Sequence, residues 1–159
     1  MRMYAVGFVA VAALALCDAT SLAQSTPPAT TTNYTSTAHM TIFSNRQGHI
    51  VEVGFQTTKP GGGSGMQVNR YTPIGHPTSS TFTYKGTTVA YFDTGTVRST
   101  WTAKVTLPGN GTFVESARGR VTGGTGTFRG ITGTLTFTGT NRLSGNIATF
   151  HARGTVTLP

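Results

Sequence analysis

The chain has 159 residues, with 12 Lys and Arg against four Asp and Glu, a net charge of +8 and a single cysteine, Cys17. The length predicts one domain, and a lone cysteine near the start excludes a disulfide scaffold and a cysteine-ligated zinc protein for the rest of the chain. The cations are spread singly and match no nucleic-acid motif, so we expect attraction to anionic surfaces without specific nucleic-acid binding.

Residues 1–23 are typical of a secretory signal peptide. Arg2 supplies the positive start, and residues 3–16 form an apolar run that is too short to span a bilayer comfortably. We therefore expect cleavage after Ala23 and a secreted or periplasmic protein with no membrane span. A lipoprotein signal, in which Cys17 is lipidated, and a retained membrane anchor are the two alternatives.

Residues 24–39 are rich in Thr, Ser and Pro and offer little to bury, which predicts a disordered linker. Over 40–159, threonine, β-branched and aromatic residues alternate between clusters of Gly, Pro or Asn, and apolar residues never recur at helical spacing. This texture predicts an all-β domain. The predicted strands are 40–44, 50–57, 66–71, 80–84, 88–93, 97–107, 112–122, 128–137 and 147–158.

The long predicted strands have one apolar face and one face of Thr and Arg, the pattern of antiparallel strands with a wet side. The segment from Pro108 to Gly111 (PGNG) is the clearest hairpin turn and joins two of these strands. Because no helix is available to cover the sheet edges, we expect the sheet to close into a single barrel.

The stretch 121–133 (VTGGTGTFRGITG) contains five glycines and invites comparison with a phosphate-binding loop. Such a loop opens a helix, and recurring glycines and β-branched residues make a helix after Gly126 unfavourable. No Lys-Ser/Thr follows for a P-loop. The stretch is better explained by a turn at Gly123 and Gly124, after which Ile131 and Leu135 share one face of a strand.

Residues 121–130 (VTGGTGTFRG), with Gly133 shortly after, resemble the signature of the allene oxide cyclase and dirigent barrel superfamily. The resemblance covers roughly residues 95–156. It implies an eight-stranded, calycin-like antiparallel barrel with an apolar cavity, in proteins that steer cyclisation or isomerisation without a cofactor. The family's catalytic residues lie largely before Gly95, where only the texture matches, so they are not carried over to this chain.

Glu115 is the most informative acid. It alternates with Phe113, Ala117 and Val121 on the apolar face of its predicted strand. A carboxyl group that points into an apolar barrel has a raised pKa and can act as a general acid or base. The alternative is a strand-end glutamate that reaches solvent near the PGNG turn.

Asp93 is the second candidate catalytic acid, placed at a strand end beside Tyr91 and Tyr84, where it would sit either at the cavity mouth or as a turn-capping residue. Glu52 lies opposite Val53 on its strand, so we expect it to be solvated.

The candidate binding site combines aromatic wall residues with these acids. The predicted wall residues are Tyr84, Tyr91, Trp101 and Phe113. The four histidines show no metal-ligand spacing, so we expect no metal site and no cofactor.

Three functions remain open at this point. The leading hypothesis is a secreted barrel that binds an apolar small molecule and steers a cyclisation or isomerisation. A non-catalytic envelope or binding module with a filled barrel is the alternative. A homodimeric aspartic protease is a remote third, in which the Asp93-Thr94-Gly95 segments of two chains would supply two aspartates. A homo-oligomer is compatible with the first two as well.

Overall fold

The computed structural model describes the chain from residue 28 to residue 159, except residues 47, 61–62, 76–79 and 143. The predicted signal peptide and the start of the predicted linker lie outside the described residues. Within the described part, no helix is long and apolar enough to cross a membrane.

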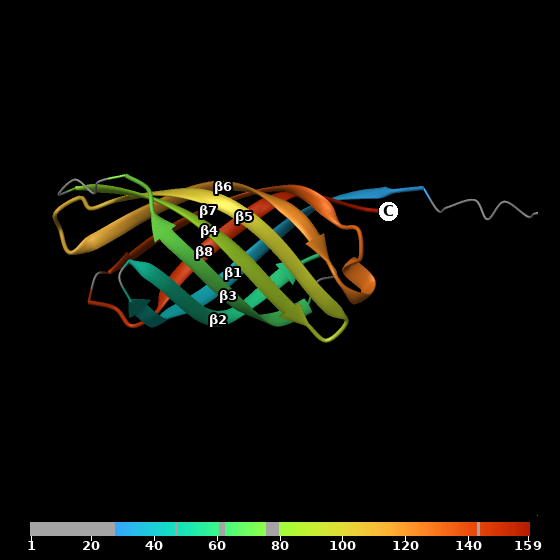
Figure 1. Cartoon of the computed structure of the whole chain (residues 1–159), viewed down its shortest axis with the longest axis horizontal. Coiled ribbons are helices and arrows are strands. Elements are labelled where there is room, and N and C mark those ends of the chain that lie inside the picture. The colour runs from blue at the N-terminus through green and yellow to red at the C-terminus, as the bar shows by residue number, and fades with distance from the viewer. Residues whose placement is uncertain (1–27, 47, 61–62, 76–79, 143) are drawn as a thin grey trace, which may run out of the picture.

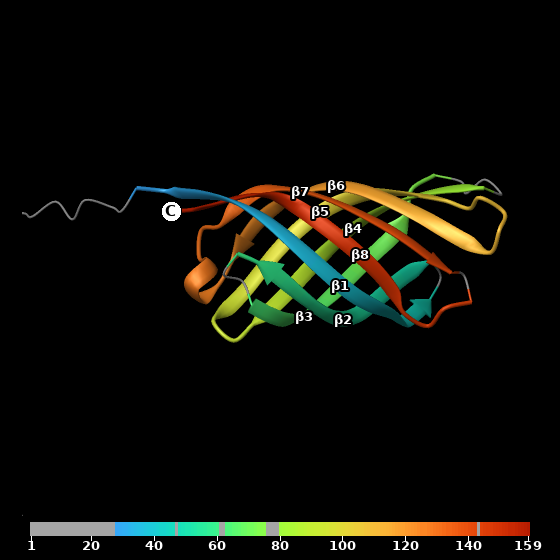
Figure 2. The same ribbon diagram turned by 180° about the vertical axis from the view of Figure 1, so that it is seen from behind.

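Eight antiparallel strands form one closed barrel, in which each strand pairs with the next and β8 pairs with β1 (Figure 1). Figure 2 shows the closure from behind, where β1 and β8 cross the barrel side by side. The predicted all-β, eight-stranded antiparallel barrel is therefore confirmed. The strands are β1 (Thr30–Arg46), β2 (His49–Lys59), β3 (Gly63–Pro73), β4 (Thr81–Phe92), β5 (Gly95–Thr106), β6 (Thr112–Gly124), β7 (Thr132–Arg142) and β8 (Ala148–Leu158).

The first strand begins at Thr30, so the prediction of a linker is wrong for 30–39. This segment pairs with β8 from Thr30↔Leu158 to Met40↔Ala148 and thereby closes the barrel. Its low hydrophobicity suggested disorder, but alternate residues such as Ala38 and Met40 are buried in the interior. Threonine is also a good strand residue. Pairing with β8 therefore makes this apparently polar segment a strand of the barrel.

The segments 80–84 and 88–93, predicted as two strands, are one strand, β4. Gly86 lies in its middle, directly opposite Trp101 of β5. A Cβ atom at Gly86 would lie 2.4 Å from the Trp101 indole, so the glycine makes room for the ring and does not end the strand.

The glycine-rich stretch forms a corner between two strands. Strand β6 continues to Gly124, a single 3₁₀ turn follows over Gly126–Phe128, and β7 begins only at Thr132. Gly126 and Gly130 have φ of +60° and +79°, values that favour glycine. The predicted strand start at residue 128 is therefore wrong by four residues, because these glycines turn the chain.

Side chains that face inward form the core. On β5, Ser99, Trp101 and Ala103 are buried while the residues between them are exposed. Trp101 belongs to the larger hydrophobic cluster, and its ring meets Phe137 edge-on with centroids 5.3 Å apart. This cluster forms one wall of the interior space described next.

Candidate functional site

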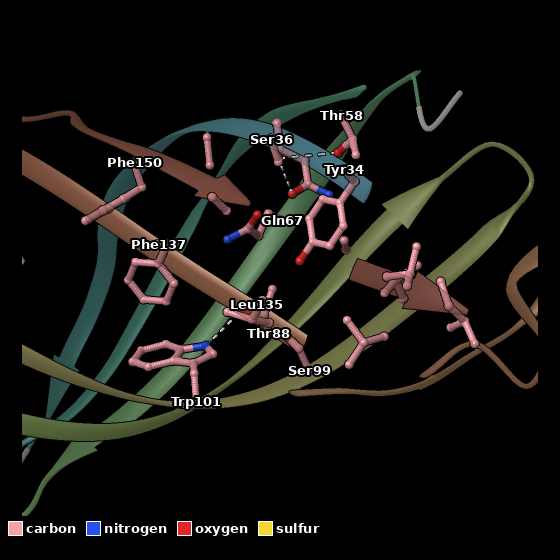
Figure 3. A pocket seen from close by; sticks show the side chains of 18 of the residues that line it. Tyr34, Ser36, Thr58, Gln67, Thr88, Ser99, Trp101, Leu135, Phe137 and Phe150 are labelled. Carbon is pink, nitrogen blue, oxygen red and sulfur yellow. Dashed lines mark hydrogen bonds between the residues drawn. The ribbon is translucent and has the colours of Figure 1, made fainter. Parts of the chain in front are cut away.

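A cavity of about 330 Å³ lies inside the barrel and receives side chains from all eight strands. Figure 3 shows Trp101, Leu135, Phe137 and Phe150 on its apolar walls and the hydroxyl of Tyr34 pointing into it. A volume of this size is within the range of small-molecule sites, which combine apolar walls with a few placed polar groups. An interior filled by side chains, as the binding-module alternative assumed, does not describe this barrel.

Glu52 is a buried acid that lines the cavity and accepts two side-chain hydrogen bonds. Its side chain is only 8% exposed, and Tyr71 Oη donates to Oε1 over 2.8 Å while Asn69 Nδ2 donates to Oε2 over 3.2 Å. Burial raises the pKa of Glu52, and the two hydrogen bonds lower it in part. Burial and the charge of Glu52 raise the pKa of Tyr71, so its phenol stays protonated and remains a donor.

A chain of hydrogen bonds extends this arrangement across the cavity wall. Trp101 Nε1 donates to Thr88 Oγ1 over 2.9 Å, and Thr88 donates in turn to Asn69 Oδ1 over 2.8 Å (Figure 3 shows the first bond). Gln67 Nε2 also donates to Asn69 Oδ1, over 3.0 Å. With its oxygen used by these donors, the Asn69 amide can only direct its NH₂ group to Glu52, so the whole chain is oriented toward the carboxylate.

Glu115 also lines the cavity, as its alternation with Ala117 and Val121 predicted. The register of β5 with β6 is continuous from Thr106↔Val114 to Ser99↔Val121, so no bulge reverses the face at this point. Burial first, and the negative charge of Glu52 second, raise the pKa of Glu115 to about 8. No hydrogen bond from the described residues reaches its carboxyl group. A pKa of about 8 keeps Glu115 mainly protonated at neutral pH, with no hydrogen-bond partner among the described residues.

Tyr34 is a third polar group that faces the cavity from β1. Burial raises its pKa to about 12, so the phenol is neutral. Its hydroxyl makes no hydrogen bond within the described part of the chain, so it is available to a ligand. Nearby, Thr58 donates to Ser36 over 3.3 Å, and Ser36 donates to Gln56 over 3.4 Å, which are long bonds between small polar side chains.

Of the predicted wall residues, only Trp101 lines the cavity. Tyr84 packs edge-on against Tyr71 with ring centroids 5.2 Å apart, and Phe113 packs against the smaller core cluster, so both lie outside the cavity lining. Tyr91 is 46% exposed on the outer face of β4. The parity of β4 explains this, because Ala90 and Phe92 point inward and Tyr91 between them must point outward.

Asp93 lies outside the cavity, in the exposed turn between β4 and β5. Asp93 and Thr94 are the two turn residues of a tight hairpin closed by the Phe92↔Gly95 pair. A small polar residue is favoured at such a turn. Of the two positions expected for Asp93, the cavity mouth and a turn, the structure shows the turn. The Asp-Thr-Gly sequence is thus part of a hairpin turn and lies outside the cavity lining of this chain.

Sequence reasoning missed Glu52 and Tyr34. Glu52 was expected to be solvated because Val53 and Phe55 alternate with it, yet the structure turns that apolar face outward and leaves Phe55 69% exposed. Alternation fixes which residues share a face but not which face points inward. Tyr34 was hidden within the predicted linker. Among the described residues, no three His, Cys, Asp or Glu side chains lie close enough to hold a metal ion.

No protein-family model and no curated protein matches the chain. Among solved structures, the chain is similar to the pterocarpan synthase dirigent protein GePTS1, with a TM-score of 0.54 and 15% sequence identity over 82% of this chain and 86% of that one. At this identity the similarity concerns the fold. The chain therefore has the dirigent-type barrel fold that its glycine-rich stretch predicted.

Proposed function

We propose that this barrel binds an apolar small molecule in its cavity and steers its cyclisation or isomerisation without a cofactor. The observation that carries the proposal is the cavity of about 330 Å³, whose apolar walls surround two buried carboxyl groups, both with a raised pKa. Holding a reactive ligand in one conformation, away from water, lowers the barrier to an intramolecular reaction even with few reacting side chains.

Glu115 is the proposed proton donor. A carboxyl group with a pKa of about 8 is close to the optimum for proton transfer at neutral pH. Its proton passes to one atom of the ligand, and the resulting carboxylate takes a proton from another atom, so the cycle consumes nothing. The Glu52 carboxyl group, held in place by Tyr71 and Asn69, and the hydroxyl of Tyr34 orient the polar end of the ligand during this exchange.

The solved dirigent protein is named as a pterocarpan synthase, and its barrel supports a ligand-steering role for this fold in general. The proposed substrate class is an apolar molecule with at least one proton-accepting atom. Secretion is part of the proposal and depends on the signal-peptide features of residues 1–23.

Trp101 provides the test, because it is the only tryptophan of the chain and it lines the cavity. The protein is titrated with N-phenyl-1-naphthylamine, a neutral apolar fluorophore that the cationic surface does not attract. Binding in the cavity should quench Trp101 emission by energy transfer and enhance the dye emission with the same dissociation constant.

Two leucine variants on β4 separate the cavity from the outer wall. Ala90 lines the cavity, and Thr87 is exposed on the opposite face of the strand. We expect Ala90→Leu to weaken dye binding by about tenfold, since it fills part of a small cavity, and Thr87→Leu to leave it unchanged. Equal affinities for the two variants, or an unaltered Trp101 emission at saturation, would contradict the proposal.

We also propose that copies of the chain associate through an apolar patch on the outer face of β2, β3 and β4. Two cross-strand rows form it, Phe55–Met66–Tyr91 and Val53–Val68–Val89. Phe55, Met66 and Tyr91 are 69%, 50% and 46% exposed. The patch carries no cation, whereas the remaining wall is strongly basic, so it is the face on which two like-charged copies can meet with least repulsion.

A further inference from the structure

A single row of outward side chains alternates threonine with a cation around the barrel. Each member pairs with the next across two neighbouring strands, so all of them share the outer face. The row begins on β3, passes every strand and ends on β2. In order, its members are Thr72, Lys85, Thr102, Arg118, Thr136, Arg153, Thr35 and Lys59. We call it the threonine–cation row.

The charges of this row are uncompensated. All eleven described Lys and Arg side chains are exposed, and within the described residues none has an ion-pair partner. Of the three described acids, Glu52 and Glu115 face the cavity and Asp93 lies in the β4–β5 turn, away from the row. A row that served stability alone would gain from acids placed opposite its cations, because opposite charges across strands stabilise a sheet. Threonine occupies those positions instead.

The row runs through two depressions of the outer wall. One, of about 670 Å³, includes Lys85 and Arg118 together with Arg70 and Arg120 of the next row. The other, of about 940 Å³, includes Arg118 and Arg153. Thr102 and Arg118 line both, so the two depressions adjoin, and we call them together the track. Strands lie about 4.8 Å apart, so successive cations of the row are about 10 Å apart along it.

We propose that this track binds a linear acidic polysaccharide whose anionic groups are carboxylates or sulfates. A guanidinium fork takes either group in a bidentate manner, and the threonine hydroxyls between the cations can hydrogen-bond to sugar hydroxyls. Regularly spaced cations suit a polymer with regularly spaced anions.

Nucleic acid is the less suitable polyanion for this face. Single strands are held by aromatic side chains on which bases stack, and no row member is aromatic. Duplex DNA is read by an element that enters a groove, whereas the track is itself a depression in a sheet wall. The same charge on a hydroxyl-rich depression of the sheet wall therefore favours a sugar polymer.

The test measures binding of the full chain to immobilised polygalacturonate, dextran sulfate, neutral dextran and duplex DNA over a series of salt concentrations. Arg118→Thr with Arg153→Thr removes two row cations. Arg46→Thr with Arg142→Thr removes two exposed cations at strand ends outside the row and leaves the same net charge. All four sites are exposed strand positions, and circular dichroism confirms the fold of both variants.

We expect the row variant to weaken polysaccharide binding by about tenfold and to reduce the salt slope by about two, one for each lost contact. The strand-end variant should change the affinity by less than about twofold. Preference for polygalacturonate or for dextran sulfate identifies the anionic group, and binding to both supports the proposal. Equal losses in the two variants, tighter binding to DNA than to either polymer, or binding to neutral dextran would overturn it.

Discussion

Tyr71 Oη donates a hydrogen bond of 2.8 Å to Glu52 Oε1 across the β2–β3 pair. Glu52 is registered with Asn69, and Tyr71 is the diagonal neighbour two residues further along β3. A long side chain on the diagonal reaches a cross-strand partner that a short one cannot. A carboxylate in the barrel interior is costly unless donors satisfy it, and β3 supplies both of them.

Tyr71→Phe should therefore destabilise the protein in a pH-dependent way. Loss of the phenol leaves one carboxylate oxygen without its donor and costs about 1–3 kcal/mol of unfolding free energy. Burial raises the pKa of Glu52, so its charge opposes folding as the pH rises through that raised value. The unfolding free energy of the variant should fall further below that of the parent protein at pH 8 than at pH 5. Denaturant unfolding at the two pH values measures this difference.

Tyr84→Phe is the matched control. Tyr84 packs against Tyr71, and no hydrogen bond within the described residues reaches its hydroxyl. Its loss should change the unfolding free energy by less than about 0.5 kcal/mol at either pH. If the two variants behave alike, the Tyr71 hydroxyl contributes no more to stability than packing does.

Gly86→Ala should destabilise the barrel through Trp101. The added Cβ atom would lie 2.4 Å from the indole. The indole can move little, because its Nε1 donates a hydrogen bond to Thr88. We expect a loss of about 1–3 kcal/mol in the unfolding free energy from this overpacking. In a Trp101→Leu background the same substitution should cost less, because the shorter side chain leaves room. A cost unchanged by that background would show that the indole is not the obstacle.

How much the sequence could predict differs between the wall and the site. The barrel, the long strands and the inward faces of β5 and β6 follow from alternation, which also placed Trp101 and Glu115 correctly on the interior side. Alternation failed for β2, because its apolar residues face outward in the exposed patch while Glu52 faces inward. Only the closure of the barrel decides such a choice, and closure depends on pairings between residues more than a hundred positions apart, such as Thr30↔Leu158.

Phe55→Ser should weaken self-association of the protein. Phe55 lies in the apolar patch of β2–β4 and is 69% exposed, so its replacement removes contact area without disturbing the core. Phe43→Ser is the matched control, since Phe43 is 76% exposed but lies at the β1 bulge outside the two rows. Sedimentation velocity should show a shift toward monomer for Phe55→Ser alone. A parent protein that is monomeric at every concentration would exclude the patch as a subunit interface.

Processing of the N-terminus is a separate prediction. The residues from Ser21 to Ala23 predict that the exported protein begins at Gln24. Intact mass and N-terminal sequencing of the exported form check this directly. A lipid-modified species that starts at Cys17 would show the lipoprotein alternative to be correct, and an uncleaved chain would support the membrane anchor.

Glu115→Gln should stabilise the protein at alkaline pH and leave its fold intact. The folded-state pKa of about 8 lies above the ordinary value of 4.5, so the folded state holds this proton more tightly than the unfolded chain does. The unfolding free energy of the parent protein therefore falls as the pH rises from about 4.5 to about 8. The glutamine variant lacks this decline, so it should exceed the parent by about 1–3 kcal/mol above pH 8 and match it near pH 4.

Asp93→Asn makes the same carboxyl-to-amide change at an exposed turn and isolates the effect of the cavity. Its unfolding free energy should follow that of the parent within about 0.5 kcal/mol at every pH. If Glu115 is the proton donor, Glu115→Gln should also keep N-phenyl-1-naphthylamine binding while abolishing turnover of any substrate identified, because a glutamine side chain fills the same space but carries no exchangeable acid. Parallel pH profiles for the two variants would place the Glu115 carboxyl in solvent. Retained turnover in the glutamine variant would instead remove Glu115 from the chemistry while leaving the cavity as a binding site.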